Sequence, residues 1–275
     1  MQPVDILILS NGPGEVTTWV RPVVKALRQK LDEDRSQVRI SVILSPCPNA
    51  TGKEAAIALS YPEVERVQSS EHFFPFLLWG KTAASWDWRE KGVVVFLGGD
   101  QFFAVAIAKR LGYRTVVYAE WDARWYHWID RFGIINSSII AKIPPSYHPK
   151  FTVVGDLMAD VSQGKRQKRV RNFEVPSKCK AHSRQAKGKK ESATELIGLL
   201  PGSKPAKLAQ GVPLCLAIAQ NIQTKRPQTR FIIPVAPTLD LQTLARFADP
   251  STNPIIDKVG GVSARLIIPS QAQPY

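Results

Sequence analysis

The chain contains little cysteine and little histidine. It has three cysteines and four histidines among 275 residues, and the cysteines lie far apart, at positions 47, 179 and 215. Three scattered thiols are too few for a disulfide framework or a clustered thiolate site, which agrees with a reducing compartment. His127 has no second histidine at metal-ligand spacing, so we expect no metal site. We expect no cofactor either.

Long uninterrupted apolar runs are also absent. No segment approaches the roughly 18–20 consecutive apolar residues that a bilayer-spanning helix needs. The N-terminus enters an apolar strand pattern at once, without the basic, apolar and small-residue order of a secretory leader. We therefore expect a cytoplasmic protein. Its 44% hydrophobic content is that of one large or two ordinary packed domains.

Acidic residues are outnumbered, but the excess of basic residues is local. Of the net charge of +14, a net of +10 lies between residues 161 and 190, where eleven Lys and Arg accompany one acid, Glu174. This stretch has almost no apolar residues, so we interpret residues 161–192 as a linker or surface insertion. Anionic lipid head groups and nucleic acid are the alternative partners. Nucleic acid is disfavoured because Phe173 alone is available for base stacking.

Outside this stretch, apolar runs alternate with helical patterns. Such alternation is typical of an α/β protein in which helices cover a parallel sheet. In the first 160 residues we predict strands over residues 4–9, 38–44, 93–97, 115–118, 133–135, 138–141 and 151–154. After the linker we predict strands over residues 196–200, 230–235 and 264–268, with helices near residues 207–224 and 239–247.

One arrangement occurs twice: an apolar strand, a glycine-containing turn and a helix. In its first copy residues 6–9 run into Ser10-Asn11-Gly12-Pro13-Gly14-Glu15, and in its second residues 197–200 run into Pro201-Gly202-Ser203-Lys204. Glycine permits a tight turn, and the unpaired N–H groups that begin a helix favour a phosphate or carboxylate. We therefore predict two Rossmann-like halves, residues 1–160 and 193–275, with a ligand cleft between them.

Five segments resemble lipid-A-disaccharide synthases, in the same order. They are Gly-Glu at residues 14–15, Phe-Leu-Gly-Gly-Asp at 96–100, Val-Val-Gly-Asp-Leu-Met-Ala-Asp at 153–160, Leu-Leu-Pro-Gly-Ser-Lys at 199–204 and Ile-Ile-Pro-Val at 232–235. The resemblance implies a GT-B glycosyltransferase fold. It also implies a UDP-activated acylated glucosamine as donor, a lipid-linked sugar phosphate as acceptor, and contact with the inner face of the cytoplasmic membrane.

The chain departs from the family's pattern at several positions. Asn11 stands where the family has an acid, Asp156 where it has a histidine, and Lys204 where it has an arginine with its planar fork for phosphate oxygens. Residues 101–103 offer no counterpart to a further family aspartate. About 80 residues follow the linker, roughly half of an ordinary nucleotide-binding domain. We therefore expect an incomplete second half, and a non-catalytic nucleotide-sugar or lipid-binding remnant is the alternative function.

Two carboxylates are candidates for the general base that sugar transfer needs. Asp100 follows the predicted strand 93–97 at the end where parallel sheets bind ligands, and we favour it first, with Glu15 second. The structural alternatives are a helix cap at Asp100 and, at Glu15, a first-turn acid opposing the helix dipole. We assign acceptor binding to the turn residues Asn11, Gly12 and Gly14.

The second glycine turn is the candidate site for the donor's phosphates. Backbone N–H groups, the Ser203 hydroxyl and the Lys204 ammonium could converge on one anion beside Gly202. The structural alternative makes Ser203 the N-cap of the next helix, with Pro205 at its first position.

Two aromatic segments have both functional and structural interpretations. Residues 73–79, with Trp86 and Trp88, suit a bilayer surface but are more often core. The second set, beside Arg124 and His127, could line a sugar pocket, although packing against the sheet is the interpretation we favour: Trp121, Trp125, Tyr126 and Trp128.

Overall fold

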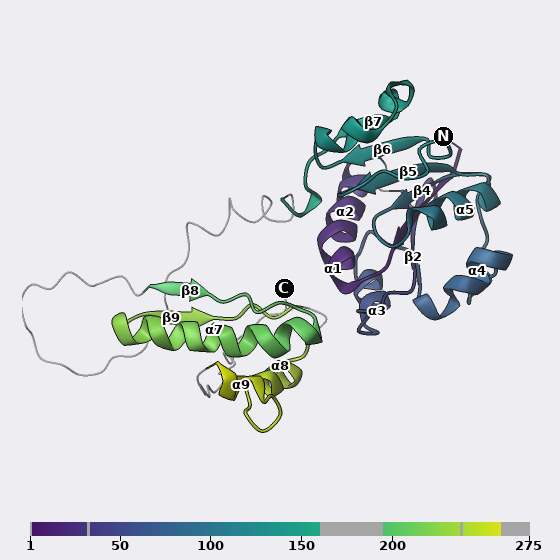
Figure 1. Ribbon diagram of the computed structural model, residues 1–275. Helices are drawn as coiled ribbons and strands as arrows, with labels where there is room; N and C mark the ends of the chain where they lie inside the picture. The colour runs from purple at the N-terminus through teal and green to yellow at the C-terminus, as the bar shows by residue number, and fades with distance from the viewer. Residues whose placement is uncertain (1, 32–33, 160–194, 237–238, 260–275) are drawn as a thin grey trace, which may run out of the picture. The chain divides into compact units, whose positions relative to one another are not determined.

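The computed structural model describes residues 2–31, 34–159, 195–236 and 239–259 (Figure 1). The chain divides into two compact units, Met1–Val175 and Pro176–Tyr275. Each unit contains a parallel sheet and helices, which confirms the predicted α/β fold class. The predicted linker at residues 161–192 and the predicted strand at 264–268 lie outside the described residues.

The first unit is built on a seven-stranded, all-parallel sheet. Its strands are β1 (Val4–Ser10), β2 (Val38–Leu44), β3 (Arg66–Gln68), β4 (Lys91–Phe96), β5 (Arg114–Ala119), β6 (Arg131–Ile134) and β7 (Phe151–Val153). They pair in the order β3-β2-β1-β4-β5-β6-β7. The order reverses between β1 and β4, so this sheet is doubly wound with its switch point at those two strands.

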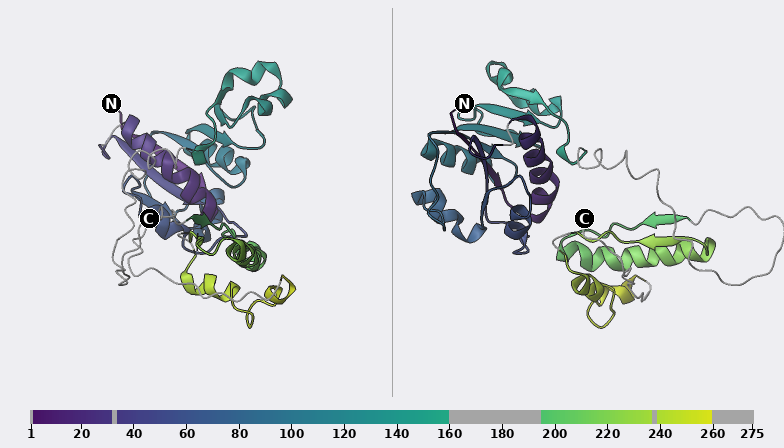
Figure 2. Two further views of the ribbon diagram at one scale, coloured as in Figure 1. Left: turned by 90° about the vertical axis from the view of Figure 1, so that its left-hand side faces the viewer. Right: turned by 180° about the vertical axis from the view of Figure 1, so that it is seen from behind.

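Helices cover both faces of this sheet (Figures 1 and 2). One face carries α1 (Pro13–Glu15), the π-helical η1 (Val16–Val20), α2 (Arg21–Lys30) and α3 (Glu54–Leu59). The other carries α4 (Phe73–Trp79), preceded by η2 (Ser70–His72), and α5 (Gln101–Leu111). The 3-10 helices η3 (Ser137–Lys142) and η4 (Pro145–Lys150) connect β6 to β7.

The strand β1 is buried because both of its faces pack against helices. Leu7 and Leu9 contribute to one core cluster, together with Phe73 and Phe76 of α4. Ile6 and Ile8 contribute to the opposite cluster, whose helical members are Val16, Val20 and Val24. The near-continuous apolar run of β1 thus follows from its place at the centre of a parallel sheet.

The predicted strand at residues 138–141 is wrong, because this segment forms η3. Asn136 caps it: the Asn136 side chain accepts a hydrogen bond from Ser138 N–H at 3.0 Å. Short polar side chains that bond the backbone two residues ahead favour turns over strands. The apolar pair Ile139 and Ile140 packs against the core from a helical turn instead.

The second unit is described as a short parallel sheet with helices. Its elements are β8 (Leu196–Gly198), α7 (Pro205–Lys225), β9 (Arg230–Ile232), α8 (Leu241–Phe247) and α9 (Ile255–Lys258). Strands β8 and β9 pair in parallel, and α7 runs alongside them (Figures 1 and 2). Leu208, Val212 and Leu216 of α7 pack with Leu244 of α8 in its core. No helix in the described part of the chain is both long and apolar enough to cross a membrane.

Candidate functional site

The loops that follow β1 and β4 leave the sheet at its switch point. Both strands end at the same edge because they are parallel and adjacent. The loop after β1 leads to α1 on one face, whereas the loop after β4 leads to α5 on the other. Divergence of this kind opens the crevice in which doubly wound sheets bind ligands.

The two loops are in close contact through glycines. A Cβ atom placed on Gly98 would lie 2.8 Å from Asn11 Oδ1 and 3.1 Å from Glu15 Cγ. At Gly99, which has a φ of +102°, a Cβ would lie 2.6 Å from Ser45 Oγ. The structure therefore brings Asn11 and Glu15 against the Gly98–Gly99 backbone, next to Asp100.

Neither glycine of the first turn has a left-handed backbone, and lack of space explains Gly12 but not Gly14. Gly12 is the N-cap of α1 with a φ of −91°, and neither Gly12 nor Gly14 has a positive φ. A Cβ at Gly12 would lie 2.4 Å from Glu15 Oε2, whereas Gly14 is exposed and would meet nothing within 4 Å. The expectation that each glycine permits a tight turn is therefore wrong for this loop.

The helix after this loop begins without a side-chain cap and contains a π-helical turn. The N-cap residue is Gly12, which has no side chain to accept a hydrogen bond from the N–H groups of the first turn. Thr17 Oγ1 donates to Pro13 O at 2.9 Å, and Thr18 Oγ1 donates to Gly14 O at 2.8 Å. π-Helical turns occur frequently at functional sites. Glu15 is the acid of the first turn, so its carboxylate opposes the helix dipole as the structural alternative predicted.

Asn11 carries an unsatisfied polar atom at this edge. Its Oδ1 is buried and has no hydrogen-bond partner among the described residues. Buried polar atoms in folded proteins are nearly always hydrogen-bonded, so such an atom calls for a ligand or a water molecule. This observation supports the assignment of Asn11 to ligand binding.

Asp100 acts as the N-cap of α5, as the structural alternative predicted. Its Oδ1 accepts a hydrogen bond from Phe102 N–H at 2.9 Å and lies 3.8 Å from Arg124 Nη2. The carboxylate is 46% exposed, so a substrate hydroxyl can reach it. A capping role and a catalytic role are compatible, since the cap holds an exposed carboxylate at the ligand-binding edge of the sheet.

Sequence reasoning missed Glu120, which follows β5 directly. Burial raises the pKa of this carboxyl, a hydrogen bond from the Trp121 side chain lowers it, and the carboxylates of Asp156 and Glu15 raise it further. Three carboxylates from separate loops therefore share one electrostatic neighbourhood. The signal available in the sequence was an acid immediately after an apolar strand, the same signal that pointed to Asp100.

Tyr118 ties the loop after β7 to this neighbourhood. Its hydroxyl donates to Gly155 O at 3.3 Å and lies 3.5 Å from Leu157 N. The ring packs edge-on against Trp19 of η1 at a centroid distance of 5.5 Å.

In the part of the chain that the structure describes, no group of three His, Cys, Asp or Glu is placed to hold a metal ion.

The phosphate-binding candidates of the second unit lie between β8 and α7. Gly202 has a φ of +107°, which favours glycine. The prediction that Ser203 caps α7 is wrong, because the N-cap is Lys204. Lys204 precedes Pro205, and a residue before proline is driven to the extended conformation that an N-cap requires, here φ −100° and ψ 142°. No side chain caps this 21-residue helix. Pro205 has no N–H, and the N–H groups of Lys207 and Leu208 both donate to Lys204 O at 2.9 Å, which leaves Ala206 N–H as the first N–H of the helix beside Ser203 and Lys204.

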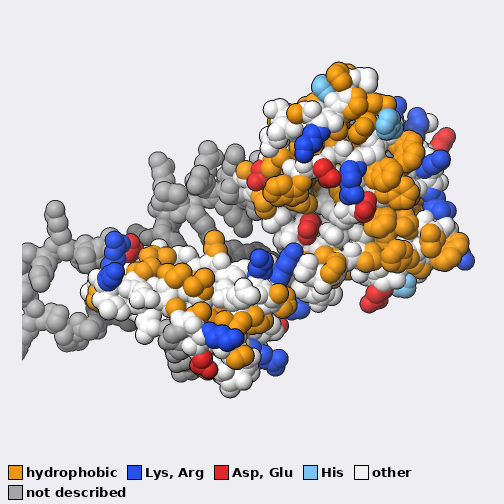
Figure 3. Space-filling model, viewed as in Figure 1, with side chains coloured by type: hydrophobic (Ala, Val, Ile, Leu, Met, Phe, Trp, Pro, Cys, Tyr) orange, Lys and Arg blue, Asp and Glu red, His pale blue; other side chains and the backbone are white. Residues whose placement is uncertain are grey.

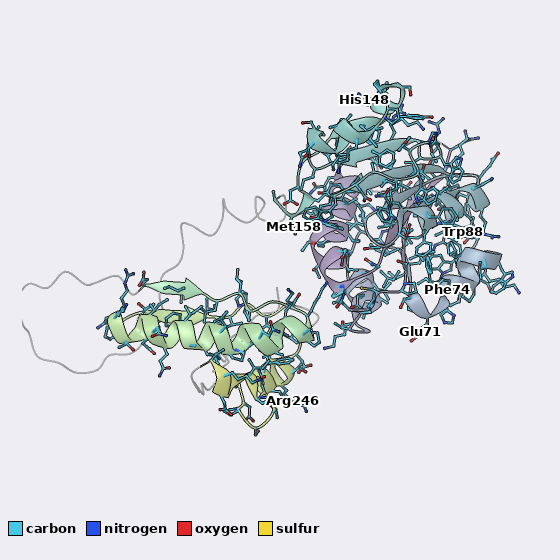
Figure 4. All side chains as sticks on the ribbon, in the orientation of Figure 1. Glu71, Phe74, Trp88, His148, Met158 and Arg246 are labelled. Atoms are coloured by element: carbon cyan, nitrogen blue, oxygen red, sulfur yellow. The ribbon has the colours of Figure 1, made fainter. Side chains whose placement is uncertain are left out.

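The first aromatic segment, residues 73–79, is buried on one side only. In α4, Phe73 and Phe76 are fully buried, whereas Phe74, Leu78 and Trp79 are 51%, 54% and 64% exposed. Figure 3 shows apolar side chains gathered on the side of the first unit where Figure 4 labels Phe74 and Trp88. The segment is thus core on one side and an exposed apolar face on the other.

The second aromatic set is largely exposed, so its favoured interpretation as packing is wrong for three of four members. Tyr126 packs against the core. Trp121, Trp125 and Trp128 are 84%, 38% and 61% exposed. His127 Nδ1 pairs with Tyr147 Oη at 2.7 Å.

Comparisons with known proteins give short and distant likenesses. No protein-family model matches the chain. A lipid-A-disaccharide synthase from Anaeromyxobacter dehalogenans (strain 2CP-C) is 38% identical over 53 residues, which are 19% of this chain and 14% of that protein. One from Anaeromyxobacter sp. (strain K) is 40% identical over 48 residues, 18% of this chain and 12% of that protein. The chain thus matches only about one-seventh of the length of these curated relatives.

Two solved structures are similar at 11% sequence identity. A UDP-GlcNAc 2-epimerase from Neisseria meningitidis, bound to UDP-GlcNAc, has a TM-score of 0.48 over 98% of this chain and 73% of its own. A putative UDP-N-acetylglucosamine 2-epimerase from Listeria monocytogenes has a TM-score of 0.49 over 99% of this chain and 70% of its own.

Proposed function

We propose that the chain acts in transfer of an acylated amino sugar from a UDP donor to a lipid-linked sugar phosphate, the reaction of the lipid-A-disaccharide synthases that it resembles. One observation carries the proposal: at the switch point of the sheet, Asn11 and Glu15 of one loop lie against Gly98 of the other, two residues before Asp100. The short matches to those synthases support the same reaction.

In this proposal the first unit binds the acceptor and activates it. Asn11, Gly12 and Gly14 bind the acceptor sugar. Asp100 takes the proton of the acceptor hydroxyl as the hydroxyl oxygen bonds to the anomeric carbon of the donor sugar. The bond from that carbon to the UDP oxygen breaks, and UDP leaves with the electron pair. Glu15 is the second candidate for the base.

The second unit would bind the donor's phosphates. The Ala206 N–H at the start of α7, the Ser203 hydroxyl and the Lys204 ammonium are the groups that stabilise the negative charge of departing UDP. The positive φ of Gly202 lets the chain present all three on one turn. Neither a metal ion nor another cofactor is required by this assignment.

Cytoplasmic location and peripheral contact with an anionic membrane stay predictions. The basic residues 161–192 would supply the attraction to anionic head groups, and they lie outside the described residues.

A transfer assay on the full chain tests the catalytic assignment. With UDP-activated acylated glucosamine and the lipid-linked sugar phosphate, we expect Asp100→Asn to lower kcat by about 10²–10⁴-fold, the usual loss when a general base is removed. Asparagine keeps the oxygen that caps α5, so unfolding does not explain such a loss. Glu90→Gln is the matched control, because Glu90 is exposed and precedes β4 at the opposite edge of the sheet.

Full activity of Asp100→Asn would remove Asp100 from the mechanism, and the same assay on Glu15→Gln then tests the second candidate. If no product forms with the unmodified chain, the alternative function gains support: a non-catalytic protein that binds a nucleotide sugar or a lipid. The observation in its favour is that the second unit, in its described residues, has a sheet of two three-residue strands.

A further inference from the structure

Three exposed aromatic rings form a continuous row that begins beside Asp100. The Phe102 and Trp125 rings have a centroid distance of 5.1 Å, and the Trp125 and Trp128 rings stack at 5.5 Å with an interplanar angle of 6°. Phe102, Trp125 and Trp128 are 42%, 38% and 61% exposed. We call these three residues the aromatic row. Large apolar rings are usually buried, so their exposure in one row requires an explanation.

The aromatic row is held in place by buried polar contacts. The side chain of Gln101, 5% exposed, donates from Nε2 to Asp122 O at 2.9 Å and accepts from Arg124 N–H at 2.8 Å. Trp125 has a φ of +57°, a conformation that is strained for a bulky residue. Strain of this kind persists where the surroundings enforce it, and it concentrates at ligand-binding sites.

Charged groups border the row at one end. Asp100 accepts the N–H of Phe102, and Arg124 Nη2 lies 3.8 Å from the same carboxylate oxygen. Arg124 Nε also lies 3.3 Å from Asp122 Oδ2. The row thus combines flat apolar faces with exposed carboxylates and a guanidinium.

We propose that the aromatic row binds the face of a pyranose ring and so positions the saccharide acceptor at Asp100. A pyranose has C–H groups on its faces and hydroxyls at its edge. The C–H faces stack on aromatic rings, and the hydroxyls bond to carboxylates and guanidinium groups. An anionic bilayer suits the site less well, because Asp100 and Asp122 would approach negatively charged head groups. The inference rests on the proposed function, since it assigns contacts to the acceptor of that reaction.

The test measures saccharide binding directly, without the transfer reaction. Glucosamine 1-phosphate, a soluble sugar phosphate of the class proposed as acceptor, is titrated into the full chain while the indole N–H signals of its seven tryptophans are followed by NMR. We expect the signals of Trp125 and Trp128 to shift with saturation. The signal of Trp79, 64% exposed at the far end of α4, should not move.

Substitution of one ring separates stacking from a structural role. Trp128→Ala should weaken binding of glucosamine 1-phosphate about fivefold, the size of one lost ring contact, and Trp128→Phe should restore most of it. Trp79→Ala is the matched control, with a similarly exposed ring: α4 meets α5 at the opposite end from Asp100, where Arg110 Nη2 donates to Leu78 O. In the transfer assay, Trp128→Ala should raise the KM for the acceptor and leave kcat nearly unchanged.

Two outcomes overturn the inference. Saturable binding of glucosamine 1-phosphate without shifts at Trp125 and Trp128 would exclude the row as its site. Sedimentation with phosphatidylglycerol vesicles that is lost in Trp128→Ala, in the absence of saccharide shifts, would make the row a membrane contact. The proposed function fails separately: saccharide binding at the row without any sugar transfer would keep this inference and reject the catalytic assignment.

Discussion

At the residue scale, Asp5 accepts a cluster of hydrogen bonds at the edge of the sheet opposite the candidate site. It is 1% exposed and bonds to the Arg39 guanidinium at 2.7 and 2.9 Å, the Tyr113 hydroxyl at 2.8 Å and the Arg89 N–H at 2.9 Å. Burial acts to raise the pKa of this carboxyl, but the hydrogen bonds from Arg39, Arg89 and Tyr113 outweigh it, so the pKa is lowered. The ionised form therefore stabilises the fold.

We predict that Asp5→Asn destabilises the protein by about 3–5 kcal/mol at pH 7, because it leaves the half-buried Arg39 without its inner counter-charge. A lowered pKa means that the stabilisation is complete above the ordinary value of 3.8 and is lost as the pH falls through the folded-state value. Denaturant unfolding should therefore show a difference between the two proteins at pH 7 that shrinks below about pH 4.

Asp87→Asn is the control for this prediction. Asp87 contacts the same Arg39 at 2.8 Å but is 77% exposed, so its loss should cost at most about 1 kcal/mol. Equal effects of the two substitutions, or a difference that does not change with pH, would contradict the account of Asp5.

The position of a polar residue that follows a strand could be predicted from the sequence, whereas the role of a polar residue inside a strand could not. Asp100 and Glu15 stand just past apolar strand patterns, so topology alone places them at the ligand-binding edge. Glu120 carries the same signal, but no resemblance drew attention to it. Asp5 lies within the strand pattern itself, and its role depends on Arg39 and Tyr113, which are brought to it by the pairing of strands far apart in the sequence.

At the element scale, the conformation of the loop between β4 and α5 requires residues without side chains at positions 98 and 99. We predict that Gly98→Ala displaces Asn11 and Glu15, since its Cβ would lie 2.8 and 3.1 Å from their atoms. Overpacking of this kind costs about 1–3 kcal/mol, so transfer activity should fall at least about tenfold while thermal unfolding stays cooperative.

Gly198→Ala is the control, because Gly198 has no positive φ and a Cβ there would meet nothing within 4 Å. Its activity and its unfolding temperature should match those of the unmodified chain. Unchanged activity of Gly98→Ala would show that the contact between the two loops tolerates a side chain and would argue against these loops as the acceptor site.

Element prediction succeeded where apolar pattern and turn chemistry agreed. The runs that became β1, β2, β4 and β5 are strands flanked by glycine or polar turns, and each contributes buried apolar residues to the core. Residues 138–141 have an equally apolar pattern, yet the cap supplied by Asn136 forms a 3-10 turn instead. Likewise Ser203 has the chemistry of an N-cap, but Pro205 fixes the cap one residue later, at Lys204.

At the scale of the whole molecule, the chain consists of two compact units, and the boundary falls between residues 175 and 176. Sequence periodicity predicted a parallel sheet in each, because alternation of strands and helices leaves few other solutions. The boundaries at residues 160 and 192 stay predictions, since they lie next to or within the undescribed stretch. Exposure of the aromatic row could not be predicted, because periodicity does not say whether a connecting loop packs its rings.

The most direct test of the central claim is calorimetric titration of the full chain with UDP. The account predicts saturable binding that Lys204→Ala weakens about tenfold, the effect of one lost charge-assisted contact to phosphate. Lys225→Ala, at the opposite end of α7, should bind as the unmodified chain does. Absence of binding at millimolar UDP, or equal binding by Lys204→Ala, would contradict the assignment of a donor site to this turn and with it sugar transfer by this chain.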